Sequence, residues 1–350
     1  MAITWSQDYT VEWRLMKVNK DTWADSGRAE FVNNARIDRD MTASVPLLES
    51  ATFDAQIPIG REWENGWYRL RAIVTQGTET ESIPIGTFRI EAGSDKVDFG
   101  TQTATLKGYS VLYPASKSYM DLGSYIPLGT DGPEFVRDLL KQGGVCAPIH
   151  LEGSYSLDDY VTYDNQTQVI KVVWDILDAG GYCMVIDGEG EIWVKPKPVQ
   201  RKLVFNSKTA NLLFPGVTRN LDYSDVPNVY KAYSGEVSAK AVNDNPDSIV
   251  STVSRGYEHQ EVATNPMRVN GESLQAYCER MLEELSTLEK TYVYNRENIS
   301  DARPFDVVNL TLPQWGVESD LRILSQSIEC GKSIKVSETA AIIIKEYVAK

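Results

Sequence analysis

The chain of 350 residues has little histidine, the side chain on which catalytic triads and many metal sites depend. Its 2 histidines, His150 and His259, lie in polar stretches, and we expect them to be surface or hydrogen-bonded side chains. The sequence contains neither an HExxH zinc motif nor a GxSxG nucleophile motif. The Gly-Lys-Ser sequence at 331–333 lacks the earlier glycine of a phosphate-binding loop, because that position is Gln326. These absences exclude the enzyme classes that are built on such motifs.

Cysteine and long hydrophobic runs are also scarce. The 4 cysteines are far apart and form no CxxC pair, so we expect reduced and mostly buried thiols rather than disulfides or zinc ligands: Cys146, Cys183, Cys278 and Cys330. No window approaches about eighteen consecutive apolar residues, which predicts that no helix spans a membrane. The segment Met1–Asp8 has no basic start and no apolar stretch, so we expect no signal peptide.

The chain lacks an excess of positive charge. It has 35 Lys and Arg against 49 Asp and Glu, a formal net charge of -14 and a sequence pI of about 4.8. Phosphate backbones attract Lys and Arg, so this balance argues against specific nucleic-acid binding. It is compatible with a protein that DNA passes without adhering.

Abundant carboxylates leave one enzyme class open. Glycoside hydrolases need only two carboxylates, which can be far apart in the sequence. Close pairs of acids are expected by chance in so acidic a chain, and we interpret them as solvated turns: Asp38 with Asp40, Asp158 with Asp159, and Asp244 with Asp247. The candidate sugar-facing loop is Trp63–Trp67, although we expect most aromatic residues to serve cores and interfaces. A β-rich carbohydrate-active enzyme or sugar-binding module is therefore the alternative function.

Alternation of apolar and polar residues predicts many short strands, most clearly at Thr10–Val18. Further strands are expected at Phe53–Ile57, Trp67–Thr75, Ile83–Glu91, Thr101–Tyr109, Leu203–Phe205, Val229–Ser234, Thr291–Tyr294, Asp306–Leu312, Leu321–Glu329 and Ala340–Tyr347. Strands at this spacing, separated by glycine and polar clusters, indicate a sandwich or a barrel.

Helical patterns occur in the middle and near the end of the chain. Gly132–Leu140 has a proline at its start and two glycines after it, and Thr167–Ala179 carries one apolar stripe. A hairpin is expected next, with strands at Tyr182–Ile186 and Glu191–Lys195. The longest helical pattern is Ser273–Lys290, whose apolar side we expect to pack on its own domain, with docking to a partner as the alternative.

Six segments, in this order, resemble motifs of the tail-hub family of bacteriophages, which comprises the central baseplate hubs of contractile tails and the tail-tip proteins of long flexible tails. They are Ser44–Phe53, Ile83–Ile90, Ala104–Leu112, Val173–Gly190, Asp225–Tyr230 and Arg303–Val308. The last keeps the motif's aspartate at Asp306 but has Phe305 in place of its glycine. The resemblance covers about residues 28 to 337.

The resemblance implies a mainly β fold with α+β insertions: two tail-tube-like β-barrels plus smaller α+β domains. Residues 1–115 would hold an N-terminal strand and the first barrel, and 116–200 an α+β insertion domain. The second barrel would be discontinuous, at 201–235 and 295–337. A small domain with the long helix would comprise 236–294 and 338–350.

The resemblance also implies a function. Three copies would form a homotrimeric ring that joins a sixfold tail tube to a threefold tip and surrounds the DNA exit channel, partly lined by acidic residues. The partners would be the distal tail or tail-tube protein, the tape measure protein, and tail-tip or fibre proteins. The family implies no catalytic, cofactor-binding or metal-binding residues and no cofactor, and places the protein in the virion at the tail tip, after assembly in the host cytoplasm. Any lytic or fibre domain would be a separate protein or absent. Another virion or secretion-machine protein with a tube-like barrel is a further reading.

Overall fold

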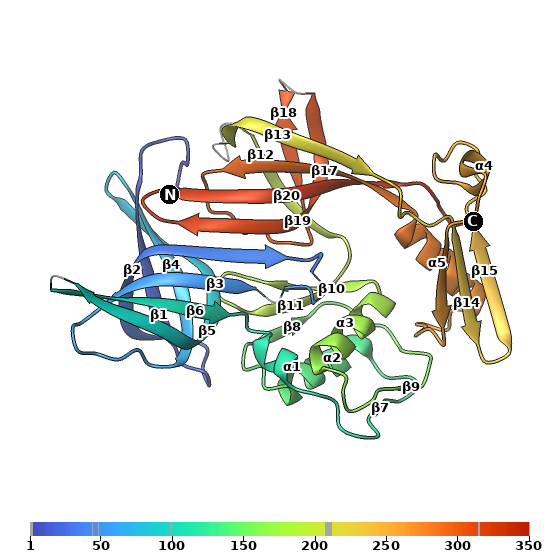
Figure 1. Cartoon of the computed structure of the whole chain (residues 1–350), viewed down its shortest axis with the longest axis horizontal. Helices are drawn as coiled ribbons and strands as arrows, with labels where there is room; N and C mark the ends of the chain where they lie inside the picture. Colours follow the sequence, from blue (N-terminus) through green and yellow to red (C-terminus); the bar gives the residue numbers. More distant parts are fainter. Residues whose placement is uncertain are drawn as a thin grey trace.

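The computed structural model describes residues 3–43, 45–47, 49–98, 100–206, 212–313 and 316–349. Ser44 and Leu48 of the first family-like segment lie outside the described residues, as do residues 207–211 of the predicted second barrel. Twelve strands form one continuous sheet, an α+β insertion lies beside it, and a small α+β unit lies at one end (Figure 1).

The first six strands close into a ring. They are β1 Thr10–Val18, β2 Asp25–Asp40, β3 Ser50–Ile57, β4 Gly66–Gln76, β5 Glu79–Asp98 and β6 Thr101–Tyr109. Neighbours pair antiparallel in the order β1-β4-β5-β6-β3-β2, and β2 pairs back with β1. Alternate side chains fill the interior, including Leu15, Phe53, Phe88 and Leu106. Because the ring is closed, each of these six strands is paired on both sides and has no open edge.

The other six strands extend the same sheet. They are β12 Val199–Phe205, β13 Leu212–Asp222, β17 Thr287–Arg296, β18 Asp306–Leu312, β19 Val317–Cys330 and β20 Ile334–Lys345. β19 pairs with β18, β20 and β2, so it joins this unit to the ring (Figure 1). β12 pairs only with β18 and β13 only with β17 among the described strands. The mainly β fold is confirmed, whereas a second closed barrel stays a prediction.

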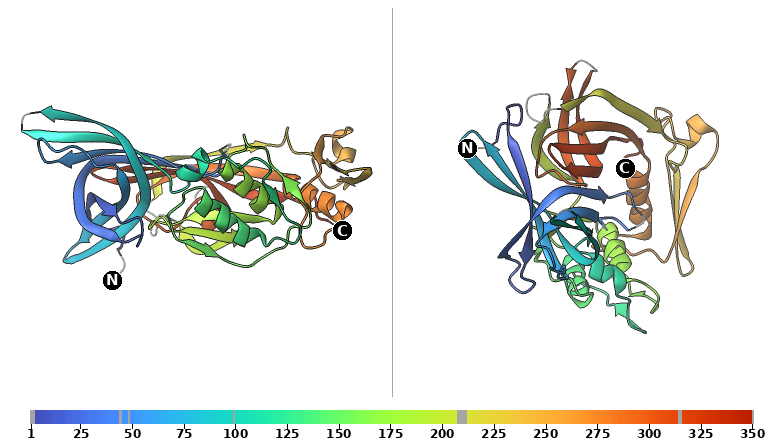
Figure 2. Two further views of the ribbon diagram at one scale, coloured as in Figure 1. Left: turned by 90° about the horizontal axis from the view of Figure 1, so that it is seen from below. Right: turned by 60° about the vertical axis from the view of Figure 1, so that its left-hand side comes forward.

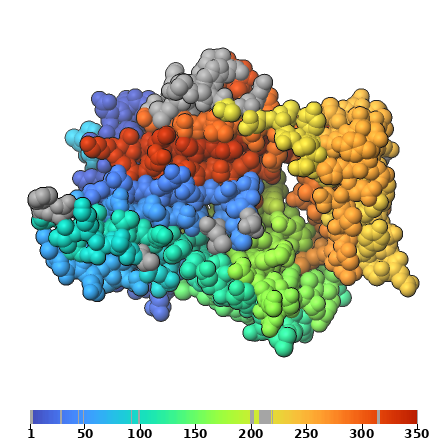
Figure 3. All heavy atoms as spheres, in the orientation of Figure 1, coloured from blue at the N-terminus to red at the C-terminus, as the bar shows by residue number. Residues whose placement is uncertain are grey.

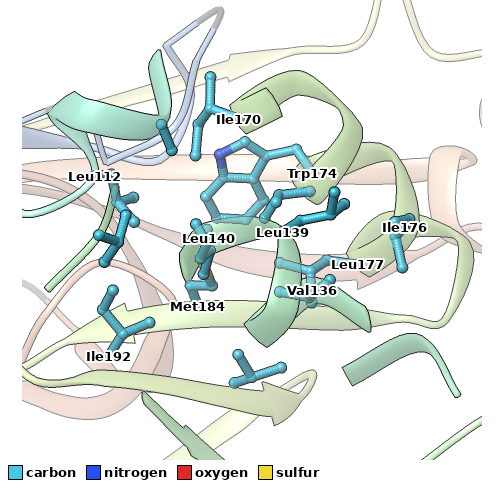
Figure 4. Packing of buried hydrophobic residues seen from close by; sticks show 14 of the residues in the cluster. Leu112, Val136, Leu139, Leu140, Ile170, Trp174, Ile176, Leu177, Met184 and Ile192 are labelled. Carbon is cyan, nitrogen blue, oxygen red and sulfur yellow. The ribbon is translucent and has the colours of Figure 1, made fainter. Parts of the chain in front are cut away.

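The insertion follows β6 in the chain. Its elements are α1 Tyr113–Lys117, β7 Tyr125–Ile126, α2 Gly132–Gln142, β8 Ile149–Leu151, β9 Val161–Thr162, α3 Val169–Ala179, β10 Tyr182–Ile186 and β11 Ile192–Pro196. The Asp131 side chain accepts a hydrogen bond from the Glu134 N–H and so caps α2. Trp174 of α3 lies among side chains of α2 and the β10-β11-β8 sheet, including Leu139 and Met184 (Figure 4).

The small unit contains β14 Val229–Ser234, β15 Val237–Val242, α4 Thr252–Arg255, β16 Gln260–Thr264 and α5 Leu274–Leu285. Its sheet has the order β15-β14-β16. Tyr277, Cys278 and Leu282 of α5 pack against Tyr230 and Ala232 of β14, so the helix buries its apolar side within its own unit, as expected. The unit lies at the far end from the ring, as the second view also shows (Figures 1 and 2).

Several predicted elements are confirmed, including α2, α3 and the β10–β11 hairpin. The predicted helix Ser273–Lys290 is wrong at its end, because α5 stops at Leu285 and β17 begins at Thr287. The residues from Thr287 onward pair with β20 over ten positions, and their β-branched and aromatic side chains favour a strand. The division of the chain into domains stays a prediction.

Candidate functional site: a buried charged junction

A cluster of buried charges lies where the ring meets the second unit. Arg39 of β2 donates through Nε to Glu49 Oε1 at 3.0 Å and through Nη2 to the Ile85 carbonyl at 2.6 Å. The side chains of Arg39 and Glu49 are 1% and 4% exposed. Burial raises the pKa of Glu49 above its ordinary range, although Arg39 and Arg303 oppose this. Removing these two charges from water therefore costs free energy, which their attraction must offset.

A second buried pair belongs to the other unit. Arg296 of β17 donates to both carboxylate oxygens of Glu338 on β20, at 3.0 and 2.6 Å. Burial by itself would raise the pKa of Glu338, but attraction to Arg296 and hydrogen bonds outweigh it, and the pKa is lowered. Gln326 of β19 lies between the pairs: its amide donates to Glu338 at 2.6 Å, and its oxygen accepts from Arg39 at 3.4 Å. One polar network thus crosses the junction.

Arg303 completes this cluster in the segment before β18. Its Nη1 donates to the carbonyls of Ser300 at 2.9 Å and Ala302 at 3.1 Å. Burial, together with the nearby Arg39, lowers the pKa of Arg303 to about 9. The network reaches backbone carbonyls as well as charged side chains, and through Gln326 it links β2, β19 and β20.

The insertion is held to the ring by the turn between β10 and β11. Glu189 in this turn forms ion pairs with Arg69 at 2.8 Å and Arg71 at 2.9 Å, both on β4. Its carbonyl accepts from Trp23 Nε1 at 2.9 Å and Thr87 Oγ1 at 2.8 Å. Three parts of the ring therefore bind Glu189 of the insertion: β4, the segment around Trp23, and β5 through Thr87.

A cleft of about 340 Å³ lies beside this turn, and three carboxylates line it: Asp187, Glu189 and Asp301. Asp187 accepts hydrogen bonds from the Trp193 Nε1 at 3.0 Å and the Glu191 N–H at 2.9 Å. Glu189 is paired with the two arginines of β4. A glycosidase needs one free carboxylic acid and one free carboxylate facing a sugar, and two of these three groups are engaged in holding the turn.

Asp38 and Asp40 lie in strand β2, so the interpretation of this acid pair as a solvated turn is wrong. Asp38 pairs with Arg36 at 3.0 Å, and Asp40 accepts from Thr42 at 2.7 Å. Asp159 forms a two-armed ion pair with Arg268.

The backbone N–H of Asp247 donates to the Asn245 side chain, which marks a turn, as expected for the Asp244–Asp247 segment. The loop of tryptophans also does not form an open sugar platform. Trp67 is 5% exposed and packs on Trp23 with ring centroids 5.5 Å apart, while Trp63 packs on Tyr68 at 4.8 Å.

Both histidines have ordinary surroundings. His150 Nε2 lies 2.7 Å from Glu191 Oε2, and its ring stacks on Trp193. The backbone N–H of His259 donates to Asn228.

The Gly-Lys-Ser sequence at 331–333 forms the turn between β19 and β20, as its position after a strand predicts.

The expectation of mostly buried thiols is confirmed, because Cys183, Cys278 and Cys330 are buried and Cys146 is exposed. Across the described residues, no group of three or more His, Cys, Asp or Glu side chains could hold a metal ion. Within the same part of the chain, no helix is long and apolar enough to span a membrane.

Large apolar side chains are exposed on the ring, at Phe31, Ile59 and Val97, and in three further regions. On the second unit they are Val204, Leu221, Tyr223, Val293 and Ile344; on the small unit they are Tyr233, Val237, Ile249, Val253, Tyr257 and Val262; on the insertion they are Tyr119, Leu122, Tyr125, Leu128 and Tyr160. Scattered exposed apolar residues are normal, but groups of them on one element indicate contact surfaces. The space-filling view shows the second unit as a continuous band above the ring (Figure 3).

A closed six-stranded ring, joined through one strand pairing to a second six-stranded unit and carrying α+β additions, defines a class of fold that is found in phage tail proteins. The described fold matches a tail protein from Neisseria meningitidis with a TM-score of 0.63 and 11% identity, over 96% of this chain and 97% of that one. It matches the 43 kDa tail protein of a Shewanella oneidensis prophage with a TM-score of 0.60 and 10% identity, over 94% and 98%. A Listeria monocytogenes prophage tail protein matches with a TM-score of 0.55 and 10% identity, over 94% of each chain.

No family model and no curated protein matches the sequence significantly. The chain therefore has the fold of phage tail proteins, which confirms the resemblance at the level of the fold.

Proposed function

We propose that this chain is a structural, non-enzymatic hub at the tip of a bacteriophage tail, acting as a homotrimeric ring in the virion. The observation that carries the proposal is the shared fold with a bacterial tail protein over nearly the full length of both chains. A shared fold over a single domain would be compatible with many functions. Here the match covers 96% of this chain, so it spans both six-stranded units as well as the insertion.

The arrangement of strands supports the ring. Each chain contributes two six-stranded units, so three copies would present six such units to a sixfold tail tube while keeping threefold symmetry toward the tip. A closed ring of copies needs different surfaces on its two sides. The single pairing partners of β12 and β13 leave strand edges that suit such contacts.

The rigid junction supports a mechanical role. Buried ion pairs often add little stability. Here Arg39–Glu49 and Arg296–Glu338, the latter within the second unit, are linked through Gln326 across the junction. A hub that transmits force between a tube and a tip needs these units at a constant angle. In this proposal the tail-tube or distal tail protein, the tape measure protein and tail-tip or fibre proteins contact the outer faces of the ring.

The channel of the ring would let DNA leave. The net charge of -14 favours a partly acidic lumen that repels phosphate. Filter binding of linear duplex DNA at about 50 mM salt should show no retention by the assembled ring. Saturable binding at that salt would contradict the acidic lumen without contradicting the ring.

The ring itself is tested by native mass spectrometry and analytical ultracentrifugation over a concentration series, with negative-stain images of the same sample. We expect a species three times the chain mass of 39.2 kDa and images with threefold symmetry and an axial hole. A species that stays monomeric up to about 100 μM, in the range of weak association, would contradict the homotrimer.

A further inference from the structure

The insertion ends in a small lobe, defined here as residues 118–131 together with 155–168. It contains the short β7–β9 pairing and lies at the side of the insertion away from the large sheet (Figures 1 and 2). In its first turn, the Ser124 N–H donates to the Asp121 carbonyl at 3.0 Å. Gly123 has a φ of +81°, so Leu122 occupies the tip of the turn, where it is 85% exposed.

The second turn of the lobe repeats this design. The Thr130 N–H donates to the Pro127 carbonyl at 3.3 Å, and Gly129 has a φ of +80°. Leu128 is therefore at the tip of this turn and is 69% exposed. The Gly129 N–H also donates to the Leu157 carbonyl at 2.8 Å, which ties the turn to the other segment of the lobe. Turn tips usually carry polar residues. Two exposed leucines that backbone hydrogen bonds hold at such tips therefore indicate a contact surface.

The lobe also carries exposed aromatic rings. Tyr125 and Tyr160 stack with ring centroids 5.0 Å apart, although they are 51% and 62% exposed. Tyr119 is 55% exposed and lies at the start of the lobe. Tyrosines that are already fixed by a neighbour lose little entropy on binding, and they are frequent at the energetic centres of interfaces.

The charge of the lobe is of one sign. Residues 118–131 and 155–168 contain no Lys or Arg but carry these carboxylates: Asp121, Asp131, Asp158, Asp159 and Asp164. Arg268 reaches the lobe from another segment, but Asp159 neutralises it with bonds of 3.0 and 2.7 Å. Asp121 and Asp164 form no ion pair within the described residues, so a partner that covers the leucines and tyrosines would meet negative charge in the lobe.

We propose that this lobe docks a basic, amphipathic segment of another protein, whose apolar side chains contact Leu122, Leu128 and the tyrosines while its Lys or Arg side chains face the carboxylates. A second copy of this chain is a poorer occupant, because each copy carries a net charge of -14 and like charges disfavour close approach. The inference goes beyond the ring contacts and does not depend on them.

The test uses the full chain and a fluorescein-labelled peptide of about eighteen residues, the length of some five helical turns, built from Leu and Lys with an amphipathic repeat. A peptide with Glu in place of Lys has the same repeat. The double variant L122S/L128S removes both leucines at exposed sites, so we expect unchanged thermal unfolding. The matched control V253S/V348S removes two exposed valines elsewhere, at 61% and 66% exposure.

We expect the Lys peptide to bind the wild type and the control equally, with Kd raised at least about tenfold in L122S/L128S, and the Glu peptide not to bind. Asp121→Asn should weaken binding and flatten its dependence on salt. Equal binding to L122S/L128S and the control, equal binding of the two peptides, or no binding of the Lys peptide would overturn the proposal. Self-association that is lost in L122S/L128S would overturn it in favour of a second copy. The oligomeric mass of L122S/L128S, compared with the wild type, separates this result from a failure of the ring.

Discussion

Arg296 and Glu338 form a two-armed ion pair, with nitrogen–oxygen distances of 3.0 and 2.6 Å, and their side chains are 2% and 0% exposed. The two residues lie on paired neighbouring strands, β17 and β20, and the Gln326 amide donates to the same carboxylate. The pair is therefore enclosed by the second unit and tied to the junction with the ring.

Glu338→Gln should destabilise the chain by about 3–5 kcal/mol, because it leaves the buried Arg296 without its counter-charge. Urea unfolding followed by tryptophan fluorescence measures this loss. The control is Asp38→Asn, which removes the partner of Arg36 in a pair whose side chains are 58% and 45% exposed, and it should cost less than about 1 kcal/mol. Equal effects of the two substitutions would show that the buried pair has no special role.

The turn that docks the insertion on the ring is a second place where one substitution should be costly. A Cβ at Gly188 would lie 2.2 Å from the Pro84 carbonyl oxygen, so Gly188→Ala must displace the turn from β5. We expect a loss of about 1–3 kcal/mol, as for other overpacked sites. At Gly66 the nearest atoms to an added Cβ are at 3.5 and 3.9 Å, so Gly66→Ala is the matched control and should have a small effect. Unchanged stability of the Gly188→Ala protein would contradict the tight contact.

Alternation made the strands Thr10–Val18 and Asp306–Leu312 predictable to the residue, and the bounds of Val229–Ser234 were also predicted correctly. β2 was missed because its sixteen residues are largely polar, and a buried Arg39 stands where the alternation would have an apolar residue. The end of α5 was missed because Leu288 continues the helical repeat, although its backbone belongs to β17.

The charged junction could not be predicted from the sequence. Arg39 and Gln326 are 287 positions apart, and only the pairing of β2 with β19 brings them together. Without that pairing, Arg39 and Glu338 are two charges among many in a chain with abundant acids. One local signal could have indicated the two arginines of the junction. Arg39 and Arg296 lie in strands whose neighbouring residues on the same face are apolar.

The four cysteines should divide into one reactive thiol and three protected ones. Burial raises the pKa of Cys183 to about 12 and also raises the pKa of Cys330, so neither forms a thiolate readily at neutral pH. Cys146 is exposed. We expect Ellman's reagent to label 1 thiol in the native protein and all 4 after denaturation. Cys146→Ser should abolish native labelling; rapid labelling of a second thiol would contradict the burial of the others.

The two buried glutamates should make stability depend on pH in opposite directions. Burial raises the pKa of Glu49, so the folded state holds this proton more tightly than the unfolded state. Its contribution to stability is complete below the ordinary glutamate pKa and is lost as the pH rises through the raised value. For Glu338, attraction to Arg296 outweighs burial and lowers the pKa, so its contribution is present above the ordinary value and is lost as the pH falls.

Single variants separate these two effects. The difference in unfolding free energy between the wild type and Glu49→Gln should decrease as the pH rises above the ordinary glutamate pKa, because the folded pKa of Glu49 is raised. The difference between the wild type and Glu338→Gln should increase as the pH rises toward the ordinary glutamate pKa and stay level above it, because the folded pKa of Glu338 is lowered. Urea unfolding at each pH gives both curves, and Asp38→Asn serves as the control at an exposed ion pair. Two curves with the same slope would mean that the carboxylates experience one common environment. Opposite slopes would show that the same junction contains one carboxyl that is expensive to charge, because it is buried, and one that is held charged by its arginine.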